Sequence, residues 1–356
     1  MWHGDFKING LDFKTSQALE KANRFQSTNA FLQQVVDLAA KLFDDSALIQ
    51  VQSSGSTGAP KTFNLDRQEL IASADLTLNY FNLRPTSRVL LCLPITAISG
   101  LMMLVRAMRG GLDLYVAEPD AGPLAHFETK PEGFFDFVAL TPYQLVHSIA
   151  YLNRAKTILV GGAPLINEQL SAIPKNLDLT IVESYGMTET LSHVALRSRF
   201  PIEAPFFSAL EPVRFSLGDA QNLIIYAPYL KQSPLVTSDR VQLFSETQFT
   251  YLGRIDHAIN SGGVKFFPEQ IEHKIQHLLA ENFFVAGCHH DTLGQQVTLF
   301  IEGNDSNRGD EVNQLLNQVN WKTYEKPRQV RVLKQFSYTS THKIDRLKTM
   351  AQLDLK

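Results

Sequence analysis

The first residues that could do chemistry form a short run of glycines and hydroxyl side chains that ends in a lysine. Residues 53–61 have the sequence SSGSTGAPK. In such a loop the backbone N–H groups can approach an anion closely, and the hydroxyls and the lysine add further donors. A phosphate-binding loop is therefore one interpretation, and a flexible surface turn is the other. The candidate phosphate contacts are Ser53, Ser54, Gly55, Ser56, Thr57, Gly58 and Lys61.

A Walker A loop is a further interpretation, because Gly55, Lys61 and Thr62 have its spacing. Pro60, however, stands where that motif requires a glycine. Since proline has no N–H to donate to a phosphate, the binding mode of a Walker A loop is not available to this segment.

A second group of polar residues follows a short apolar run. Residues 179–182 (LTIV) have the character of a buried strand, and residues 183–189 (ESYGMTE) come directly after them. The strand would deliver these side chains to the carboxyl edge of a sheet, where ligand crevices form in α/β proteins. Tyr185 could then stack on a purine, and Thr188 could donate to a phosphate. Glu189 could hold Mg²⁺ together with phosphate oxygens, whereas a structural turn with a solvated glutamate is the alternative.

Two charged residues farther along the chain suit a ribose. Asp239 could accept hydrogen bonds from two ribose hydroxyls, and Arg254 could add a donor. Taken alone, an aspartate or an arginine is usually a solvated surface charge. The two residues therefore indicate a ribose site only if neighbouring motifs predict the same ligand.

These side chains need a scaffold, and the apolar pattern indicates its class. Short apolar runs, each followed by turn or loop residues, alternate with helical patterns over residues 68–79 and 167–172. Runs of four or five apolar residues suit strands buried on both faces of a largely parallel sheet. We therefore predict an α/β protein with a large N-terminal α/β domain, its mostly parallel sheets flanked by helices. The expected strands are residues 89–93, 137–140, 157–160 and 179–182.

The pattern changes after about residue 215 and predicts a second domain. Strand-like segments at residues 222–227 and 241–244 lead to Asp256. A helix is expected over residues 268–279, because Pro268 suits its first turn and acidic residues favour its N-terminal end. We place the boundary at Asp256, which gives an N-terminal domain of residues 1–255 and a small, mobile α+β domain of residues 256–356.

Composition excludes several classes of protein. The chain has 356 residues, 44% of them hydrophobic, and a net charge of −3. These values fit a globular protein of about two domains, without the positive field expected of a nucleic-acid-binding protein. The uncharged run at residues 89–105 contains Pro94 and Gly100 and is shorter than the roughly 20 apolar residues of a membrane span. The two distant cysteines and the lack of a signal peptide predict a cytoplasmic protein.

Together the motifs resemble those of the adenylate-forming enzymes, the superfamily of acyl-CoA synthetases, luciferases and peptide-synthetase adenylation domains. Residues 53–61 resemble the phosphate-binding motif of that superfamily, and residues 339–346 (TSTHKIDR) resemble the segment that carries its catalytic lysine. The motifs between them occur in the same order as in the superfamily. They are residues 161–164 (GGAP, the adenine-side turn), 183–189 (the tyrosine-glycine-x-threonine-glutamate motif), 237–239 (TSD, the ribose site), 253–256 (GRID, the hinge) and 261–263 (SGG).

The resemblance implies ATP, Mg²⁺ and coenzyme A as ligands and a small-molecule carboxylic acid as substrate. It gives the catalytic roles to Lys343, Thr188 and Glu189, with Glu189 as the metal ligand. It makes Asp256 the hinge and puts Gly262 and Gly263 on the coenzyme A side. Besides the phosphate loop, the implied nucleotide contacts are Gly162, Ala163, Pro164, Glu183, Ser184, Tyr185, Gly186, Asp239 and Arg254.

The sequence also departs from the superfamily pattern. Most of the first 100 or so residues of the superfamily are missing, since the phosphate loop begins at residue 53. Ala97 stands where a histidine is common, and Ser337 and His342 replace a proline and a glycine near Lys343. These departures keep open a non-catalytic, nucleotide-binding protein that retains the fold.

Within the superfamily, residues 186–197 (GMTETLSHVALR) are most similar to the short bacterial o-succinylbenzoate–CoA ligases of menaquinone biosynthesis. This resemblance implies an ATP-dependent acid–CoA ligase that acts through an acyl-adenylate. The implied acid has a second carboxylate, which needs a cationic or multi-donor partner. Ser192, His193 and Arg197 are candidates because they directly follow the active-site motif. Another acyl-CoA ligase, or an enzyme that loads a carrier protein, is the alternative.

Overall fold

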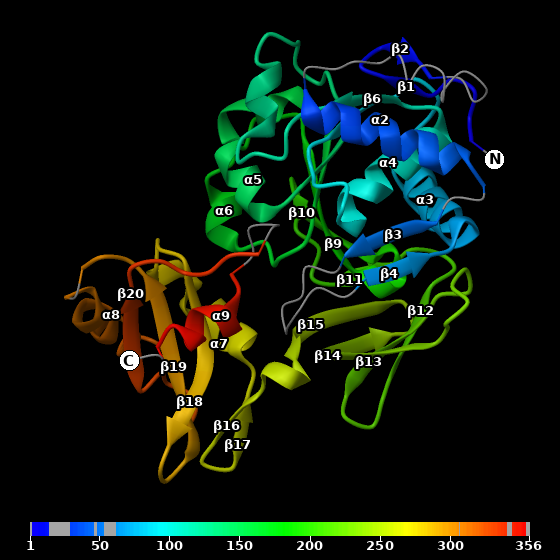
Figure 1. The fold of residues 1–356 in the computed structure, drawn as a ribbon. Helices are drawn as coiled ribbons and strands as arrows, with labels where there is room; N and C mark the ends of the chain where they lie inside the picture. Colours follow the sequence, from blue (N-terminus) through cyan, green and yellow to red (C-terminus); the bar gives the residue numbers. More distant parts are fainter. Residues whose placement is uncertain are drawn as a thin grey trace. The chain divides into compact units, whose positions relative to one another are not determined.

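The computed structural model describes residues 2–13, 29–45, 48–52, 62–305, 307–339 and 344–353 (Figure 1). The chain forms two compact units, which we call unit 1 and unit 2. Unit 1 comprises Met1–Leu165, Gln169–Arg214 and Ala227–Ser233. Unit 2 comprises Ile166–Glu168, Phe215–Tyr226 and Pro234–Lys356.

Unit 1 is built on a mixed sheet with a parallel centre. Its strands run in the order β11-β10-β9-β8-β7-β5-β6-β1-β2. The pairs from β9 through β6 to β1 are parallel, whereas β10 is antiparallel to β9 and to β11. A separate antiparallel hairpin joins β3 to β4. The strands are β1 (Lys7–Ile8), β2 (Leu11–Asp12), β3 (Ile49–Gln52), β4 (Thr62–Leu65), β5 (Arg88–Leu91), β6 (Asp113–Val116), β7 (Phe137–Leu140), β8 (Thr157–Val160), β9 (Thr180–Met187), β10 (Ser192–Phe200) and β11 (Phe207–Ala209).

The parallel strands are buried, as the apolar runs predict. All four residues of β7 are buried, and so are Leu90 on β5 and Ile158 on β8. Each of the four expected strands is present, which confirms the α/β class. Helices flank the sheet (Figure 1), and those that begin before residue 170 are α2 (Ala30–Phe43), α3 (Arg67–Tyr80), α4 (Ile98–Gly110), α5 (Pro142–His147) and α6 (Asn167–Ser171).

Helices α3 and α4 lie side by side and position part of the site described below (Figure 1). Asp66 caps α3, because its side chain accepts the N–H groups of Gln68 and Glu69. Helix α4 is capped at its C-terminal end by Gly111, whose left-handed φ of 66° favours glycine. The uncharged run at residues 89–105 is thus divided into strand β5, a loop and helix α4. In the described part of the chain, no helix is long and apolar enough to cross a membrane.

Unit 2 contains two sheets. The first has the order β12-β13-β14-β15, and the second has the order β17-β16-β19-β18, with β20 parallel to β19. The strands are β12 (Arg214–Leu217), β13 (Asn222–Tyr226), β14 (Leu235–Ser245), β15 (Gln248–Arg254), β16 (Ile259–Ser261), β17 (Val264–Phe266), β18 (Phe283–His290), β19 (Gly294–Glu302) and β20 (Gln329–Leu333). The helices are α7 (Pro268–Ile275), α8 (Arg308–Leu316) and α9 (Arg346–Ala351).

The second sheet of unit 2 carries its own core. Ile271 and Ile275 on α7 pack with Val285, Val297 and Leu299 on the central strands. The helix expected over residues 268–279 has its α-helical part at Pro268–Ile275, after which the chain tightens into a 3₁₀ turn. The domain boundary predicted at Asp256 lies within unit 2, between its two sheets. The 3₁₀ helices are Pro123–Phe127, Ile149–Arg154, Thr188–Thr190, Ile255–His257 and Gln276–Leu278.

Candidate functional site

The predicted adenine-side turn lies close against β9 in unit 1. A Cβ atom on Gly161 would lie 2.4 Å from Ser184 Oγ, so a side chain at this position would require that hydroxyl to move. Gly162 has a φ of 90°, which also favours glycine. Gly162, Ala163 and Pro164 are exposed, so the turn presents its backbone to solvent beside the β9 motif.

Glu183 is the centre of a buried ion-pair group that holds this turn. Its carboxylate is bound by Arg197, with Nη2 2.6 Å from Oε2, and by the guanidinium of Arg199. Oε1 accepts the N–H of Leu165 at 3.1 Å. Because Leu165 follows Pro164 directly, Glu183 ties the turn to β9 and β10. Arg197, a candidate for the substrate pocket, is thus engaged with Glu183 in this structure.

The remainder of the β9 motif lies in the close antiparallel pairing of β9 with β10. A Cβ on Gly186 would lie 2.2 Å from the carbonyl oxygen of Ser192, so the two strands meet only because residue 186 is glycine. Tyr185 is buried, and its ring centroid lies 5.9 Å from that of Phe207. Thr188 is half-buried at the start of a 3₁₀ turn that follows β9.

Glu189 offers carboxylate oxygens of the kind that Mg²⁺ takes as ligands. It lies in the same 3₁₀ turn and is exposed. Protein sites for Mg²⁺ often supply only one or two carboxylates and leave the other positions to water and substrate phosphates. A single exposed carboxylate next to the β9 motif therefore fits the ion. Among the described residues, no cluster of three histidine, cysteine or acidic side chains offers an all-protein metal site.

A buried polar ring joins β10 to helices α3 and α4. Arg106 donates from Nε to Thr77 Oγ1 at 3.0 Å and from Nη2 to Ser192 Oγ at 2.6 Å. His193 closes the ring, with Nε2 3.1 Å from Thr77 Oγ1 and Nδ1 3.2 Å from Ser192 Oγ. The structure thus brings together Ser192 and His193, both predicted near the substrate, with two residues that sequence analysis did not single out.

Arg106 carries a buried charge without an acidic partner. Its side chain is 2% exposed, and no carboxylate of the described residues forms an ion pair with it. Burial lowers the pKa of its guanidinium to about 9. Burial, and secondly the charge of Arg106, hold the pKa of His193 well below its usual range. The sequence signal for Arg106 is the charge itself, which interrupts the apolar helix that begins after Pro94.

The predicted ribose and hinge residues form a second cluster, in unit 2. Asp239 on β14 pairs in register with Arg254 on β15, and Arg254 Nη1 lies 3.4 Å from Asp239 Oδ1. Arg254 also donates to both carboxylate oxygens of Asp256, at 2.9 and 2.7 Å. Burial alone would raise the pKa of Asp256, but the hydrogen bonds and charge of Arg254 outweigh it and hold that pKa below its ordinary value. Asp256 is therefore an ionised partner of Arg254.

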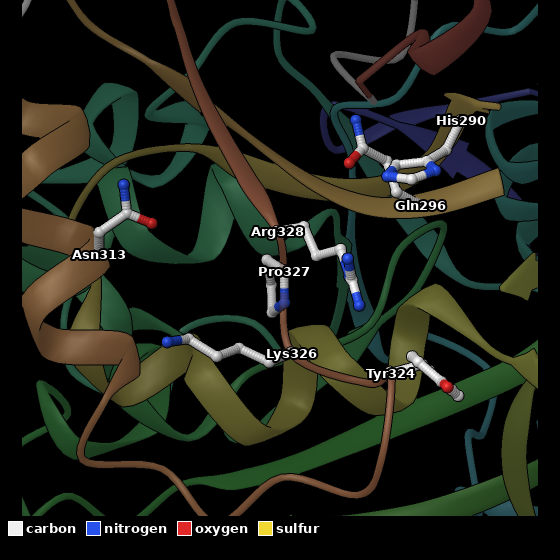
Figure 2. A pocket seen from close by; sticks show the side chains of 7 residues that line it. All are labelled: His290, Gln296, Asn313, Tyr324, Lys326, Pro327 and Arg328. Carbon is white, nitrogen blue, oxygen red and sulfur yellow. The ribbon is translucent and has the colours of Figure 1, made fainter. Parts of the chain in front are cut away.

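The predicted coenzyme A side lies next to a cavity of about 560 Å³ in unit 2. A Cβ on Gly262 would lie 3.2 Å from the ring of Tyr324, so the turn at Gly262 and Gly263 lies against that ring. Figure 2 shows Lys326 extending toward α8 and Arg328 toward Tyr324. The cavity is lined by His290, Gln296, Asn313, Tyr324, Lys326, Pro327 and Arg328, none of which is acidic.

Two predicted elements lie outside the described residues: the phosphate loop at residues 53–61, and Lys343 with its neighbours from 340 to 342. In the described chain just after Lys343, two side chains form stabilising contacts. Asp345 caps α9 by accepting the N–H of Lys348 at 3.0 Å. Arg346 donates from Nη2 to Glu272 on α7 at 2.9 Å.

Comparison with known proteins agrees with the motifs. A family model described as AMP-binding enzyme matches residues 8–209. The 2-succinylbenzoate–CoA ligase of Listeria monocytogenes is 27% identical over 326 residues, covering 83% of this chain and 68% of the ligase. A probable 2-succinylbenzoate–CoA ligase of Mycobacterium tuberculosis is 28% identical over 277 residues, covering 72% of this chain and 71% of that protein.

Solved structures support the same fold. An AMP-forming acyl-CoA synthetase/AMP-acid ligase II-like protein from Dyadobacter fermentans is 32% identical, with a TM-score of 0.60; the match covers 93% of this chain and 97% of that one. The o-succinylbenzoate coenzyme A synthetase of Bacillus subtilis, solved with ATP and magnesium, has a TM-score of 0.72 at 19% identity. That match covers 85% of this chain and 69% of the synthetase. The α/β fold expected from the sequence is thus confirmed.

Proposed function

The chain belongs to the AMP-binding enzyme family, and from that premise we propose that it is a cytoplasmic, AMP-forming acid–CoA ligase that converts o-succinylbenzoate to o-succinylbenzoyl-CoA. The motif order, and relatives named as ligases of this acid, support the proposal. The observation that carries the choice of acid is the buried, unpaired charge of Arg106 in the polar ring.

A buried arginine without an acid is costly unless a ligand supplies the missing charge. Arg106 donates a hydrogen bond to Ser192, the first residue of β10. An acid with two carboxylates can present one to ATP and the other to this guanidinium. Charge-assisted hydrogen bonds of that kind are about twice as strong as neutral ones. A mono-acid would leave the charge uncompensated, so the ring favours a dicarboxylate.

In the first half-reaction a carboxylate oxygen attacks the α-phosphorus of ATP, and the bond from that phosphorus to the departing pyrophosphate breaks. We assign the adenine side to the turn at residues 161–164 and the β9 motif, and the ribose to Asp239 and Arg254. Glu189 would hold Mg²⁺, which when bound would supply neutralisation of charge on the phosphates. Thr188 and the loop at residues 53–61 supply further phosphate donors.

Lys343 is assigned the transition-state contact of this step. Negative charge gathers on the transferring and departing phosphoryl groups, and an ammonium positioned there stabilises the transition state more than the ground state. The support is the resemblance of residues 339–346 to the catalytic-lysine segment. Just beyond Lys343, the chain is anchored by the contacts of Asp345 and Arg346.

In the second half-reaction the thiol of coenzyme A attacks the acyl carbon, AMP leaves with the carboxylate oxygen, and the thiol proton is lost to solvent. We assign the thiol side to the turn at Gly262 and Gly263. The adjacent cavity suits the phosphates of coenzyme A, because it offers Lys326 and Arg328 and no acidic lining residue. Asp256 is assigned as the hinge about which the C-terminal domain changes orientation between the two half-reactions.

The test is pyrophosphate release, measured with and without coenzyme A over a panel of aromatic and aliphatic acids. The proposal expects o-succinylbenzoate to be the preferred acid and thioester formation to require coenzyme A. An adenylate that forms but does not react with coenzyme A would favour loading of a carrier protein. Nucleotide binding without any pyrophosphate release would favour a non-catalytic homologue.

A further inference from the structure

The four members of the polar ring form a closed circuit of hydrogen bonds. Thr77 and His193 are at most 5% exposed, and the two hydroxyls of the ring accept from Arg106. His193 contacts both hydroxyls, one through each ring nitrogen. Each side of the imidazole therefore has a defined partner, which a histidine that merely fills space would not require.

The donors and acceptors available in the polar ring determine the role of His193. A neutral imidazole has one N–H donor and one acceptor nitrogen. One hydroxyl must therefore donate to the acceptor nitrogen of the imidazole, and the other must accept from the imidazole N–H. Protonation would place a second positive charge beside Arg106 in a buried site, and both burial and that charge keep His193 neutral. The imidazole thus fixes the direction of both hydroxyl groups.

The guanidinium is held in turn by these oriented hydroxyls. Of its five N–H donors, one bonds to Thr77 and one to Ser192, while Nη1 has only the sulfur of Met103 at 3.7 Å. The remaining donors have no partner among the described residues. The hydroxyl that accepts from His193 also keeps its own proton for another acceptor. The polar ring therefore keeps several N–H and O–H donors in a fixed geometry. A carboxylate oxygen that binds there requires such donors.

We propose that His193 is a positioning residue that sets the selectivity for dicarboxylate substrates: it orients Thr77 and Ser192, and through them Arg106, without touching the substrate itself. This inference rests on the proposed function. It predicts that changes at His193 act on recognition of the second carboxylate and spare the adenylation chemistry.

The test compares His193→Leu and His193→Gln with the unaltered protein. The acids are o-succinylbenzoate and the two analogues that each lack one of its carboxylates. In the leucine variant, KM for o-succinylbenzoate should rise about tenfold while kcat changes less than about twofold, as expected when hydrogen bonds common to ground and transition states are lost. The analogue that is still adenylated should keep its KM. Glutamine retains a donor and an acceptor, so His193→Gln should recover most of the loss.

A double-mutant cycle with Thr77→Val distinguishes a positioning role of His193 from general damage to the protein. If His193 acts through Thr77, the double variant should be no worse than the poorer single variant. Arg109→Ala on the same helix, which removes an arginine paired with Asp75, is the matched control and should keep normal kinetics. Equal KM increases for the dicarboxylate and the analogue, or additive losses in the cycle, would overturn the inference. Failure of the unaltered protein to adenylate o-succinylbenzoate would instead overturn the proposed function.

Discussion

Replacing Arg106 by methionine should stabilise the substrate-free protein and impair substrate binding. Burial lowers the pKa of Arg106 to about 9, and each tenfold loss of proton affinity corresponds to about 1.4 kcal/mol, so burial destabilises the charged form by several kcal/mol. A positively charged group whose pKa is lowered in the folded state destabilises the fold fully below about pH 9, and this cost fades as the pH rises above that value toward the ordinary pKa of a guanidinium. At neutral pH the whole cost therefore applies.

The hydrogen bonds from Arg106 to Thr77 and Ser192 offset part of this cost. Replacing buried charges by apolar side chains of similar volume often gains about 1–4 kcal/mol. For a unit of about 200 residues, at about 2–4 °C per kcal/mol, that is a rise in Tm of roughly 2–16 °C. Loss of charge-assisted hydrogen bonds to the second carboxylate should raise KM for o-succinylbenzoate by about 10²-fold. This opposition between stability and binding is characteristic of a functional buried charge.

Thermal melting without ligands and initial-rate kinetics measure the two effects. Arg109→Met, on the same helix but paired with Asp75, is the control and should change neither quantity by much. The reasoning would be refuted if Arg106→Met lowered Tm and left KM for the dicarboxylate unchanged, because Arg106 would then be a structural residue.

Three further predictions concern the other assigned residues. Lys343→Ala should slow acyl-adenylate formation by roughly 10²-fold or more while thioester formation from synthetic acyl-adenylate stays nearly normal; equal loss of both would remove the residue from the first step. Asp256→Pro, by fixing φ near −65°, should spare adenylation and sharply reduce thioester formation, whereas equal loss with a lowered Tm would indicate misfolding. Glu183→Gln should lower the free energy of unfolding by about 1.5–3 kcal/mol, because it removes one charge partner from the buried Arg199 and leaves it only the exposed Glu203; an unchanged free energy of unfolding in chemical denaturation would contradict this.

The parallel core could be predicted because local sequence determines it. Residues 137–140 are apolar without interruption and are followed by turn or loop residues, and a run of this length suits a strand buried on both faces. The helix that starts at Pro268 was predictable for a similar local reason, the suitability of proline for a first turn. Its early end was not, because no glycine or proline marks Gln276–Leu278, where the chain forms a 3₁₀ turn.

The polar ring could not be predicted, because its contacts are distant in sequence. Arg106 and Ser192 are 86 positions apart, and Thr77 and His193 are 116 apart. The same limit applies to Glu183, which the motif assigns to the nucleotide but which the structure engages with Arg197 and Arg199 across the β9–β10 pairing. Motif order identified the residue types of the site, whereas pairing between strands and helices decides which of them meet.

The central claim is that the acid is activated as an adenylate, and isotope transfer tests it most directly. o-Succinylbenzoate labelled with ¹⁸O in its carboxylates would be incubated with the protein, ATP, Mg²⁺ and coenzyme A, and the nucleotide product analysed by mass spectrometry. Because the carboxylate oxygen that attacks the α-phosphorus leaves with AMP, the account predicts one ¹⁸O in each AMP formed. Label found in inorganic phosphate with ADP as the nucleotide product, or AMP formed without label, would contradict it.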